Sequence, residues 1–357
     1  ICPYRLDKSP GQRFRFEQYL NHLRKNKYDI EISFLLNEKD ESIFYSNDKI
    51  ILKFFLLLKI LYTRFKDVKR SKHFDIIFIY REAFPIGSSF IEKLISKNNA
   101  NIIYDFDDSI HLKKVSDGNK RFNFLKNPNK VKKIISMSSL TIVGNDFLKK
   151  FAISYNENTS VFPTTIDTDL YNSNNFKKKI NSNGICIGWS GSFTTIEHFE
   201  TVIPVLEKIK KKYQNKVTFK LIGDKDYFNE SLGLKGEEWS MENEIEELLK
   251  IDIGIMPLKN NDWEKGKCGL KGLQYMALNI PTIMSDVGVN NQIIQDGING
   301  FLSTSEEEWF DKISILIDDK NLREQMGKQG RYSVEKKYSL NANKDTYLNF
   351  FNGLVNR

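Results

Sequence analysis

Short apolar runs alternate with segments of helical periodicity along almost the whole chain. Runs that are apolar at successive positions are typical of strands buried on both faces of a parallel sheet. We predict such strands at residues 30–35, 75–80, 101–105, 140–143 and 160–162 in the first half of the chain, and at residues 184–189, 217–222, 251–256 and 282–285 in the second half.

The segments between these runs have the apolar spacing of amphipathic helices. Strands that alternate with helices in this way predict two α/β units with parallel sheets, each the size of a Rossmann-type domain. The predicted helices are residues 14–25, 48–66, 87–97, 127–137 and 146–152, followed by 195–212, 242–250, 270–278, 291–295, 305–317 and 321–336.

The polar stretch at residues 172–183 has almost no apolar side chains, so we predict that it links a first domain at residues 1–171 to a second domain at residues 184–337. A length of 357 residues fits two domains, and 40% hydrophobic residues suffice for packed cores. This composition excludes a disordered or fibrous chain. Ligands of open α/β sheets bind at the carboxyl ends of strands, so the residues that follow each strand are the candidate site residues.

Three cysteines and four histidines are scattered along the chain without the spacing of a disulfide framework or a metal centre. Reduced thiols favour a cytoplasmic protein. The chain begins at Ile1 rather than at a methionine, so we expect the native start to lie upstream.

Basic charge is concentrated in the first half of the chain. Residues 1–170 contain 29 Lys and Arg against 20 Asp and Glu, whereas the remainder contains 25 against 26. A basic half indicates an anionic partner, which is nucleic acid, a membrane surface or an acidic substrate. A generally lysine-rich composition is the alternative explanation. We expect no nucleic-acid partner, since no known recognition motif is present.

Residues 49–70 combine a broad apolar face with several Lys and Arg residues. A basic amphipathic helix of this kind can lie in an anionic membrane interface. The alternative is a core helix whose lysines extend along its surface to water. The apolar run at residues 50–62 is interrupted by Lys53 and Lys59, and it is shorter than the roughly 20 residues of a membrane-spanning helix.

The strand predicted at residues 184–189 leads into Ser190, Gly191 and Ser192, and a helix is predicted directly after them. Small residues let a ligand approach the backbone, and the N–H groups of a helix start attract anions, so a phosphate or diphosphate could bind there. Neither the dinucleotide-binding fingerprint nor the P-loop is present. An ordinary strand-to-helix turn explains the segment equally well.

Lys267 and Lys271 lie four residues apart and share one face at the start of a predicted helix. Cations at this end of a helix are unfavourable by themselves, and a shared anionic ligand would remove the conflict. Two solvated surface lysines are the alternative. Cys268 is expected to be a small packing residue rather than a nucleophile, since no histidine lies nearby in the sequence.

Asp105, Asp107 and Asp108 end or follow the strand predicted at residues 101–105. A DxD pair can hold Mn²⁺ or Mg²⁺, but the phosphate-binding signals lie in the other half of the chain. We therefore favour a metal-free role for these carboxylates at the ligand site. A capped loop with Asp107 at a helix start is the alternative. Arg15, near the chain start, is expected on a helix surface.

Two sets of motifs resemble the GT4 family of retaining, nucleotide-sugar-dependent glycosyltransferases. In the second half they are IGWSGS, FKLIGD, DIGIMPL and GKCGLKGLQYMALNIPTIMSDVGVNNQIIQDGINGFL. In the first half they are SPGQRFRFEQYL, IIYDFDDSI, TIVGN and VFPTTID. The resemblance covers most of the chain and is more specific in the second half.

The resemblance implies the GT-B fold, in which two Rossmann-like domains have parallel sheets facing a central cleft. It also implies a nucleotide-sugar site in the second domain, an acceptor site mainly in the first, and catalysis without a metal or other cofactor. The last helix, at residues 338–357, would cross back to pack on the first domain.

The resemblance also points to site residues. For the donor diphosphate and sugar they are Gly11, Gln12, Arg13, Ser190, Gly191, Ser192, Lys267, Cys268, Gly269, Leu270 and Lys271; for the ribose and base, Gly223, Asp224 and Gln274; and for catalysis, Asp107, Asp108, His111 and Lys271. In the front-face mechanism proposed for such enzymes, the departing phosphate oxygen takes the acceptor proton. Cations that stabilise the diphosphate are then required, and a protein nucleophile is not.

One departure from the family concerns the donor site. Many GT4 members have two glutamates separated by seven residues, which contact the donor sugar and the ribose. The aligned positions here are Gly266 and Gln274. The chain thus resembles a branch with a GKCGxK pattern, in which Lys271 and Gln274 would recognise the donor differently.

These features predict a retaining, hexosyltransferase-type enzyme that moves a sugar from a nucleotide-sugar to a glycan or lipid-linked acceptor in bacterial surface polysaccharide or glycoconjugate synthesis. We expect it in the cytoplasm, where residues 49–70 would dock to the inner face of the plasma membrane. One alternative is another GT-B enzyme such as a nucleotide-sugar epimerase, for which no acid/base pair is evident. The other is a non-catalytic scaffold that binds sugar nucleotides, which the missing glutamates suggest.

Overall fold

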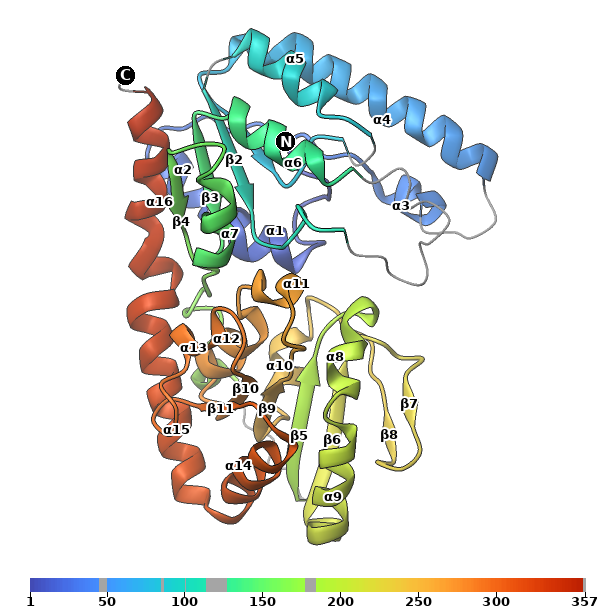
Figure 1. Cartoon of the computed structure of the whole chain (residues 1–357), viewed down its shortest axis with the longest axis vertical. Helices are drawn as coiled ribbons and strands as arrows, with labels where there is room; N and C mark the ends of the chain where they lie inside the picture. Colours follow the sequence, from blue (N-terminus) through green and yellow to red (C-terminus); the bar gives the residue numbers. More distant parts are fainter. Residues whose placement is uncertain (45–49, 85–86, 100, 114–126, 177–183, 356–357) are drawn as a thin grey trace. The chain divides into compact units, whose positions relative to one another are not determined.

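The contacts in a computed structural model divide the chain into two units (Figure 1). The structure describes residues 1–44, 50–84, 87–99, 101–113, 127–176 and 184–355. Unit 1 comprises Ile1–Pro163 and Lys344–Arg357, and unit 2 comprises Thr164–Asn343. The division comes before the predicted linker, of which residues 177–183 lie outside the described residues.

Unit 1 contains a sheet of four parallel strands in the order β1-β2-β3-β4. The strands are β1 (Ile77–Tyr80), β2 (Ile102–Phe106), β3 (Leu140–Val143) and β4 (Thr159–Val161). Every residue of β2 and β3 is buried, as expected for central strands of a parallel sheet. The helices are α1 (Pro10–Arg15), α2 (Leu20–Lys25), α3 (Glu38–Phe44), α4 (Ile50–Arg70), α5 (Phe90–Asn98), α6 (Asn129–Met137), α7 (Asp146–Ala152) and most of α16 (Leu340–Val355), with short turns η1 (Glu17–Tyr19) and η2 (Ser71–His73).

Unit 2 contains a parallel five-stranded sheet in the order β11-β10-β9-β5-β6. The strands are β5 (Ile185–Ser190), β6 (Val217–Ile222), β9 (Ile253–Met256), β10 (Thr282–Ser285) and β11 (Phe301–Ser303), and a separate antiparallel pair is formed by β7 (Phe228–Asn229) and β8 (Leu234–Lys235). The helices are α8 (Ile196–Glu200), α9 (Ile203–Tyr213), α10 (Glu244–Leu248), α11 (Asp262–Lys265), α12 (Leu270–Ala277), α13 (Asn290–Ile293), α14 (Glu306–Asp318) and α15 (Lys320–Ser333), with short turns η4 (Ser173–Asn175), η5 (Phe193–Thr195), η6 (Gln214–Lys216) and η7 (Val334–Tyr338).

The predicted fold class is confirmed, because each unit is a Rossmann-like α/β half with a parallel sheet. Several predicted elements differ. The helix expected at residues 14–25 contains the end of α1, the short turn η1 and the helix α2. The helix expected at residues 195–212 is divided into η5, α8 and α9, since Pro204 in the first turn of α9 has no N–H to continue the preceding helix. The segment expected as a strand at residues 30–35 joins no sheet among the described residues, and its backbone bonds to that of residues 2 and 3.

The last helix packs on unit 1 from Lys344 onward. The ring of Tyr347 is buried and stacks on that of Tyr19, with centroids 4.3 Å apart. The hydroxyl of Tyr28 donates a hydrogen bond to the side-chain oxygen of Asn352 (2.8 Å). These contacts attach α16 to the region of α1 and α2.

Helix α4 attaches to unit 1 along one side only. Leu56 and Ile60 are buried, and the fully buried Arg64 donates hydrogen bonds to the carbonyl oxygens of Ala83 (2.6 Å) and Cys2 (3.1 Å). Within the described parts of the chain, no helix has both the length and the apolar character that crossing a membrane would require.

Candidate functional site

The carboxyl ends of β5 and β6 meet at two glycines in unit 2. Gly191 follows β5, and its N–H group donates a hydrogen bond to the carbonyl oxygen of Ile222, the last residue of β6 (2.9 Å). Gly223 has a φ of +128°, and a Cβ atom there would lie 1.5 Å from the carbonyl oxygen of Gly191. Only glycine at position 223 therefore lets the two loops come this close.

The N–H groups at the end of β5 are already used within the protein. That of Ser190 donates to the hydroxyl of Tyr275 (2.7 Å), and that of Gly191 is bound to β6. The hydroxyl groups of Ser192 and Thr194 are exposed and hydrogen-bond to each other (2.8 Å). An anion at this loop would therefore meet these hydroxyls and a nearby lysine rather than the first two N–H groups.

That lysine is Lys271, in the first turn of α12. Its Nζ lies 4.5 Å from the centroid of the Trp189 ring, which is a cation–π contact, and 3.5 Å from the hydroxyl oxygen of Thr195. A Cβ atom on Gly191 would lie 2.8 Å from the same Nζ. The predicted neighbourhood of Gly191 and Lys271 is thus present in the structure.

Lys271 is half-buried, and this burial lowers its pKa to about 7. The positive charge of Lys267 contributes to this shift, whereas the negative charge of Glu264 opposes it. An anionic ligand beside Nζ would favour the protonated amine, so binding of the anion and protonation of Lys271 would support each other. Phosphate groups bind strongly through such charge-assisted hydrogen bonds.

The loop before α12 has a conformation that requires glycine at one position. Gly269 is the N-cap of α12 with a φ of +71°, and a Cβ atom there would lie 2.2 Å from Cδ1 of Ile293. This left-handed residue turns the chain into the helix that carries Lys271. The other predicted residues of the loop are Lys267 and Cys268, both half-buried, and Leu270, the first residue of α12.

Gln274 and Asp224, predicted for the ribose and base side, have partners within unit 2. Gln274 is buried, and its amide nitrogen donates to the hydroxyl of Tyr171 (3.1 Å) and to Oε1 of Glu244 (3.0 Å). The carboxylate of Asp224 accepts the N–H group two residues further on (2.9 Å) and so caps its own turn. These bonds hold the second unit together locally.

In unit 1, a second cluster lies at the carboxyl ends of β1 and β2. Oδ1 of Asp107 accepts hydrogen bonds from the Tyr80 hydroxyl (2.8 Å) and from Nε (3.0 Å) and Nη2 (2.8 Å) of Arg81. A Cβ atom on Gly11 would lie 2.5 Å from the Tyr80 hydroxyl oxygen and 3.4 Å from Oδ2 of Asp107. The structure thus brings together the predicted residues Gly11 and Asp107.

The aspartates of the DxD pair have separate arginine partners. Asp105 is fully buried and accepts hydrogen bonds from Nε (3.1 Å) and Nη2 (3.0 Å) of Arg15, so the expected surface position of Arg15 is wrong. Burial raises the pKa of Asp105 to about 6, although Arg15 opposes the shift. Burial would raise the pKa of Asp107 as well, but the charges of Arg81 and Arg15, with the hydrogen bonds from Arg81 and Tyr80, together outweigh it and hold that pKa below the usual value. Asp108 accepts the N–H group of the next residue (3.0 Å).

His111 is packed against α7. Its ring stacks on that of Phe151, with centroids 3.9 Å apart. Burial lowers the pKa of His111 to about 4, and the charge of Lys132 acts in the same direction. The imidazole is therefore neutral at pH 7 and can accept or donate one hydrogen bond without carrying charge.

Gln12 and Arg13 belong to α1. Gln12 is fully buried, and its side chain accepts the N–H group of Tyr4 (2.9 Å) and donates to the carbonyl oxygen of the same residue (3.0 Å). The guanidinium of Arg13 lies over the ring of Phe14, 4.6 Å from its centroid. Gln12 therefore holds the preceding loop in place.

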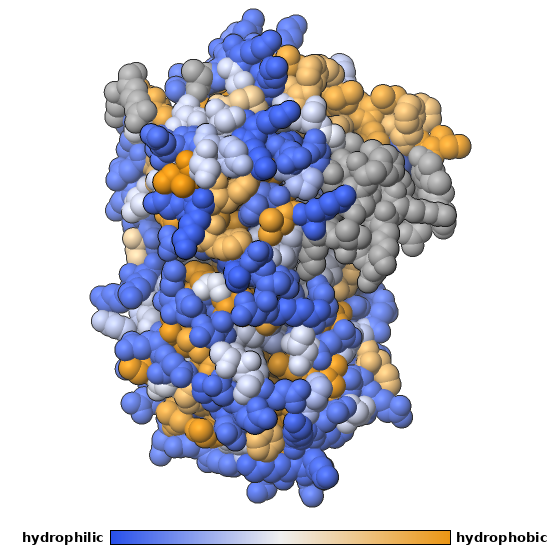
Figure 2. Space-filling view, viewed as in Figure 1, coloured by the Kyte–Doolittle hydropathy of each residue, from blue (hydrophilic) through white to orange (hydrophobic). Residues whose placement is uncertain are grey.

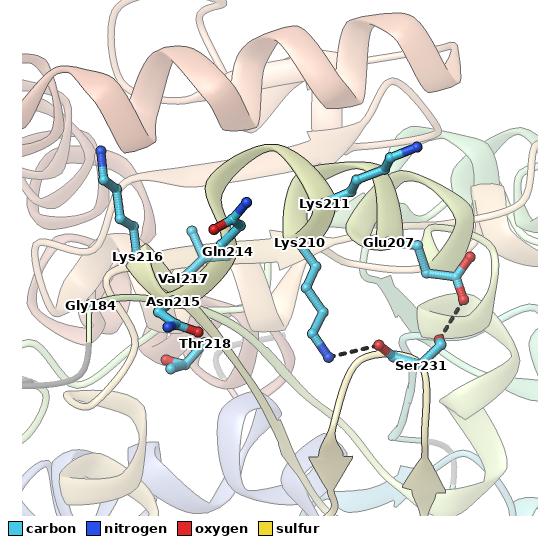
Figure 3. Close-up of a pocket in the computed structure, with 10 residues that line it drawn as sticks. All are labelled: Gly184, Glu207, Lys210, Lys211, Gln214, Asn215, Lys216, Val217, Thr218 and Ser231. Atoms are coloured by element: carbon cyan, nitrogen blue, oxygen red, sulfur yellow. Dashed lines mark hydrogen bonds between the residues drawn. The ribbon is translucent and has the colours of Figure 1, made fainter.

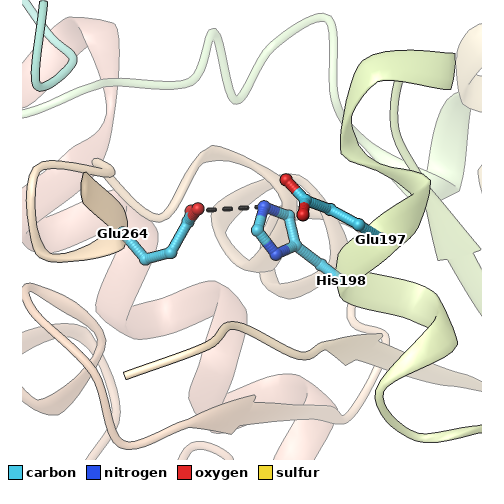
Figure 4. Close-up of side chains that lie close together, drawn as sticks. All are labelled: Glu197, His198 and Glu264. Carbon is cyan, nitrogen blue, oxygen red and sulfur yellow. Dashed lines mark ion pairs between the residues drawn. The ribbon is translucent and has the colours of Figure 1, made fainter. Parts of the chain in front are cut away.

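A further cluster in unit 2 consists of Glu197, His198 and Glu264 (Figure 4), whose nearest ligand atoms all lie within 4.8 Å of one another. Nε2 of His198 is 3.2 Å from Oε2 of Glu264, and the two side chains are 1% and 2% exposed. Glu197 is partly exposed and accepts a hydrogen bond from Lys259 (3.1 Å). The cluster joins α8 to α11.

A pocket of about 1230 Å³ lies at the end of the unit 2 sheet that is opposite to the carboxyl ends of its strands (Figure 3). It begins at the amino ends of β5 and β6, whereas ligands of open α/β sheets bind at the carboxyl ends. It is therefore not a candidate donor site. Its lining residues are Gly184, Glu207, Lys210, Lys211, Gln214, Asn215, Lys216, Val217, Thr218 and Ser231.

Sequence reasoning missed several residues of these clusters, and three of them illustrate the reasons. Tyr80 is the last residue of β1 and of the strand predicted at residues 75–80, and the rule considered only the residues that follow each strand. Trp189 lies inside a buried strand, where an aromatic residue is normally part of the core. Glu264 has no local signal, because its contact with His198 exists only in the folded unit.

Residues 171–333 match the sequence model of the family described as glycosyl transferases, group 1. No curated protein sequence matches the chain significantly. Three solved structures resemble it in fold, each at 13% sequence identity. A glycosyltransferase from Rickettsia africae aligns over 97% of this chain and 96% of its own, with a TM-score of 0.69. Anabaena HepE in complex with UDP and glucose aligns over 93% of this chain and 88% of its own, and sucrose-phosphate synthase from Thermosynechococcus elongatus over 87% and 81%, each with a TM-score of 0.63. The chain therefore has the GT-B fold, and its residues 171–333 match the group 1 glycosyl transferases in sequence.

Proposed function

We propose that the protein is a retaining glycosyltransferase of the GT4 type, in a branch with the GKCGxK pattern, that transfers a hexosyl group from a nucleotide-sugar to a glycan or lipid-linked acceptor. The family match of residues 171–333 and the GT-B fold support glycosyl transfer. Retention rests on the resemblance of residues 266–277 to the GT4 family. The observation that carries the proposal is the half-buried ammonium of Lys271 beside Trp189, at the carboxyl end of β5.

The proposed chemistry needs positive charge where the diphosphate departs. Negative charge grows on the leaving phosphate as its bond to the sugar breaks, and a cation already in place stabilises this charge most effectively. Lys271 and Lys267 supply that charge in our proposal, which requires no metal. The departing phosphate oxygen then takes the proton of the acceptor hydroxyl, so no carboxylate nucleophile is needed.

Unit 1 is proposed to bind the acceptor. Arg81 keeps Asp107 ionised, and an ionised carboxylate can accept a hydrogen bond from an acceptor hydroxyl. The net basic charge of residues 1–170 would suit an acceptor that carries phosphate on a lipid. We therefore place the enzyme at the cytoplasmic face of the membrane, in bacterial surface polysaccharide or glycoconjugate synthesis.

A panel of UDP-, GDP- and dTDP-sugars tests the proposal. One donor is expected to raise the melting temperature by several degrees, since a ligand at 100 times its Kd stabilises a protein by about 2.7 kcal/mol. The same donor is expected to be hydrolysed slowly without acceptor, which a scaffold would not do. Conversion of the donor into a different sugar nucleotide would indicate an epimerase. If no donor binds or is hydrolysed, the proposed activity is wrong.

We also propose that α4 docks unit 1 to an anionic membrane. One face of this helix exposes Ile51, Phe55, Leu58, Tyr62 and Phe65, with alternating spacings of four and three residues. Figure 2 shows apolar surface gathered along this helix. A contiguous exposed patch of this kind indicates a surface that something else covers. Further exposed apolar side chains of the patch are Leu52, Phe54 and Phe90.

The charges of α4 favour a lipid surface over a second copy of the chain. Lys66 and Lys69 are exposed, and the ammonium of Lys66 lies 4.7 Å from the ring centroid of Tyr62. The single acidic residue of α4, Asp67, pairs with the buried Arg64 (2.6 Å). Two copies would bring these lysines towards one another, whereas anionic lipid headgroups would neutralise them.

Replacing Phe55 and Leu58 by serine is expected to lower binding to vesicles that contain phosphatidylglycerol by at least about tenfold. Each side chain contributes about 1.5–3 kcal/mol when it is transferred fully from water to an apolar phase, and partial transfer contributes less. Phe228→Ser, which removes a phenylalanine that is 67% exposed on β7, is the matched control and is expected to bind like the wild type. Co-sedimentation measures both variants.

Two results would contradict the membrane assignment. One is equal binding to vesicles of phosphatidylcholine alone, which would remove the role of charge. The other is a concentration-dependent dimer, measured by light scattering, that the double variant abolishes. A dimer of that kind would mean that a second copy covers the patch.

A further inference from the structure

The start of α8 joins the proposed diphosphate site to a buried pair of side chains within unit 2. Thr195, just before α8, lies 3.5 Å from Nζ of Lys271 through its hydroxyl oxygen. His198 comes three residues later, on the same side of the turn, and lies 3.2 Å from Glu264. Lys271 and Glu264 therefore pack against the same short stretch of chain.

Glu264 is fixed through its backbone as well as its side chain. Its N–H group donates to the side-chain oxygen of Asn261 (3.0 Å), which caps α11, and its carbonyl oxygen accepts the N–H group of Lys267 (3.0 Å). The Glu264 side chain is 2% exposed. A carboxylate held away from water in this way acts strongly on neighbouring charges, since little solvent lies between them.

We propose that Glu264 is a positioning residue, held by His198, that sets the charge which Lys271 presents to the donor diphosphate. This inference rests on the proposed function, because it takes the diphosphate as the ligand of Lys271. The charged groups that act on Lys271 are Lys267, from the adjoining loop, and Glu264, from α11. Burial and Lys267 both favour the neutral amine, and Glu264 opposes them. A neutral amine cannot form an ion pair with phosphate, and the negative charge of Glu264 favours the protonated form that can.

The arrangement favours this role over a cation site made of the same three side chains. Glu197 is partly exposed and already paired with Lys259 (3.1 Å), so a cation would have to compete with an ammonium group for that carboxylate. His198 and Glu264 alone supply two ligand atoms. Structural zinc sites normally have four ligands, and catalytic ones have three from the protein.

The test is the pH dependence of UDP binding, measured by calorimetry between about pH 6 and about pH 9. The wild type is expected to lose affinity above about pH 7, by about tenfold per pH unit, as Lys271 loses its proton. Glu264→Gln keeps the shape of the side chain but removes its charge. In that variant the decline is expected to begin at least about half a pH unit lower. A substitution that only loosened the fold would weaken binding without moving the pH of the decline.

Variants of His198 test how the carboxylate is held. His198→Phe is expected to shift the decline in the same direction as Glu264→Gln, whereas His198→Gln retains an N–H group near the position of Nε2 and is expected to resemble the wild type. The double variant His198→Phe/Glu264→Gln is expected to shift no further than Glu264→Gln, because both changes act through one charge. Thermal melting confirms that each variant is folded.

An unchanged pH of the decline in Glu264→Gln, with UDP still bound, would overturn this inference while leaving the proposed function intact. Failure of the wild type to bind UDP, or any other nucleoside diphosphate, at every pH would reject the proposed function itself. Stoichiometric binding of Zn²⁺ or Mn²⁺ that Glu264→Gln abolishes would also overturn the inference, since Glu264 would then serve as a metal ligand.

Discussion

Replacing Lys271 by methionine is expected to weaken binding of UDP by about 10- to 100-fold. The lysine presents a half-buried ammonium group at the carboxyl end of β5, and hydrogen bonds that involve charged groups contribute about 1.5–3 kcal/mol. Methionine retains an unbranched apolar side chain against the ring of Trp189, so the loss reports charge rather than packing. Calorimetry at about pH 6, about one unit below the pKa of Lys271, where most of this lysine carries its proton, measures the effect.

Lys265→Met is the matched control for this substitution. Lys265 lies in α11 of the same unit, and its ammonium pairs with the carboxylate of Asp262 (2.9 Å). The control removes the same formal charge from the same region, so it accounts for the general attraction between unit 2 and an anion. Its affinity for UDP is expected to stay within about twofold of the wild type. Equal losses in both variants would mean that Lys271 makes no specific contact with the diphosphate.

Strands with clear apolar runs could be predicted from the sequence almost without error. The predicted bounds of β3, β6 and β10 are those of the structure. Most of their residues are buried, and polar residues follow each run. Their parallel order could also be predicted, because a helix between two strands is the connection that parallel pairing needs.

Elements that depend on distant partners could not be predicted in this way. β11 (Phe301–Ser303) has only one fully buried residue, and it is a strand because it pairs with the edge of β10. Residues 30–35 show the opposite error. Their apolar run is genuine, but the backbone of Ser33 and Leu35 bonds to that of Cys2 and Pro3, and the segment joins no sheet in the part of the chain that the structure describes.

In the candidate site, too, some features could be predicted from the sequence and others depend on contacts in the folded chain. Gly191 was selected because it follows a strand, Lys271 because it lies four residues from Lys267 at a helix start, and Gly11 through the family resemblance. The structure places each of them beside other candidate groups. The sequence does not reveal which hydrogen bonds are already made. The N–H group of Ser190 is bound to Tyr275, and the amide of Gln274 is bound to Glu244, although both looked available for a ligand.

Replacing Arg15 by methionine is expected to destabilise unit 1 by about 3–5 kcal/mol. Arg15, in α1, bonds to both oxygens of Asp105 in β2, and its Nη1 donates to the carbonyl oxygen of Phe162 after β4. Both charged side chains are completely buried. Breaking a buried pair by removing one partner leaves an uncompensated charge, which is the reason for the large effect.

The effect of Arg15→Met is expected to increase with pH. The folded pKa of Asp105 is about 6 and its ordinary value is 3.8. Between these values the folded state holds a proton that the unfolded state has released, so this group's contribution to stability falls as pH rises through the window. Without Arg15 the folded pKa rises further, and the window extends to higher pH. The loss of stability is therefore expected to be smaller at about pH 5 than at about pH 8.

Hydrogen exchange of peptides from β2 and β3, followed against denaturant, measures this loss within unit 1. All four tryptophans of the chain, at positions 189, 239, 263 and 309, belong to unit 2, so their fluorescence reports that unit as an internal control. The double variant Arg15→Met/Asp105→Leu is expected to recover more than half of the lost stability, because it removes the buried carboxylate that has lost its partner and fills the volume with apolar atoms. If the double variant were less stable than Arg15→Met alone, the position would require the ion pair itself, and the argument from an uncompensated carboxylate would be wrong.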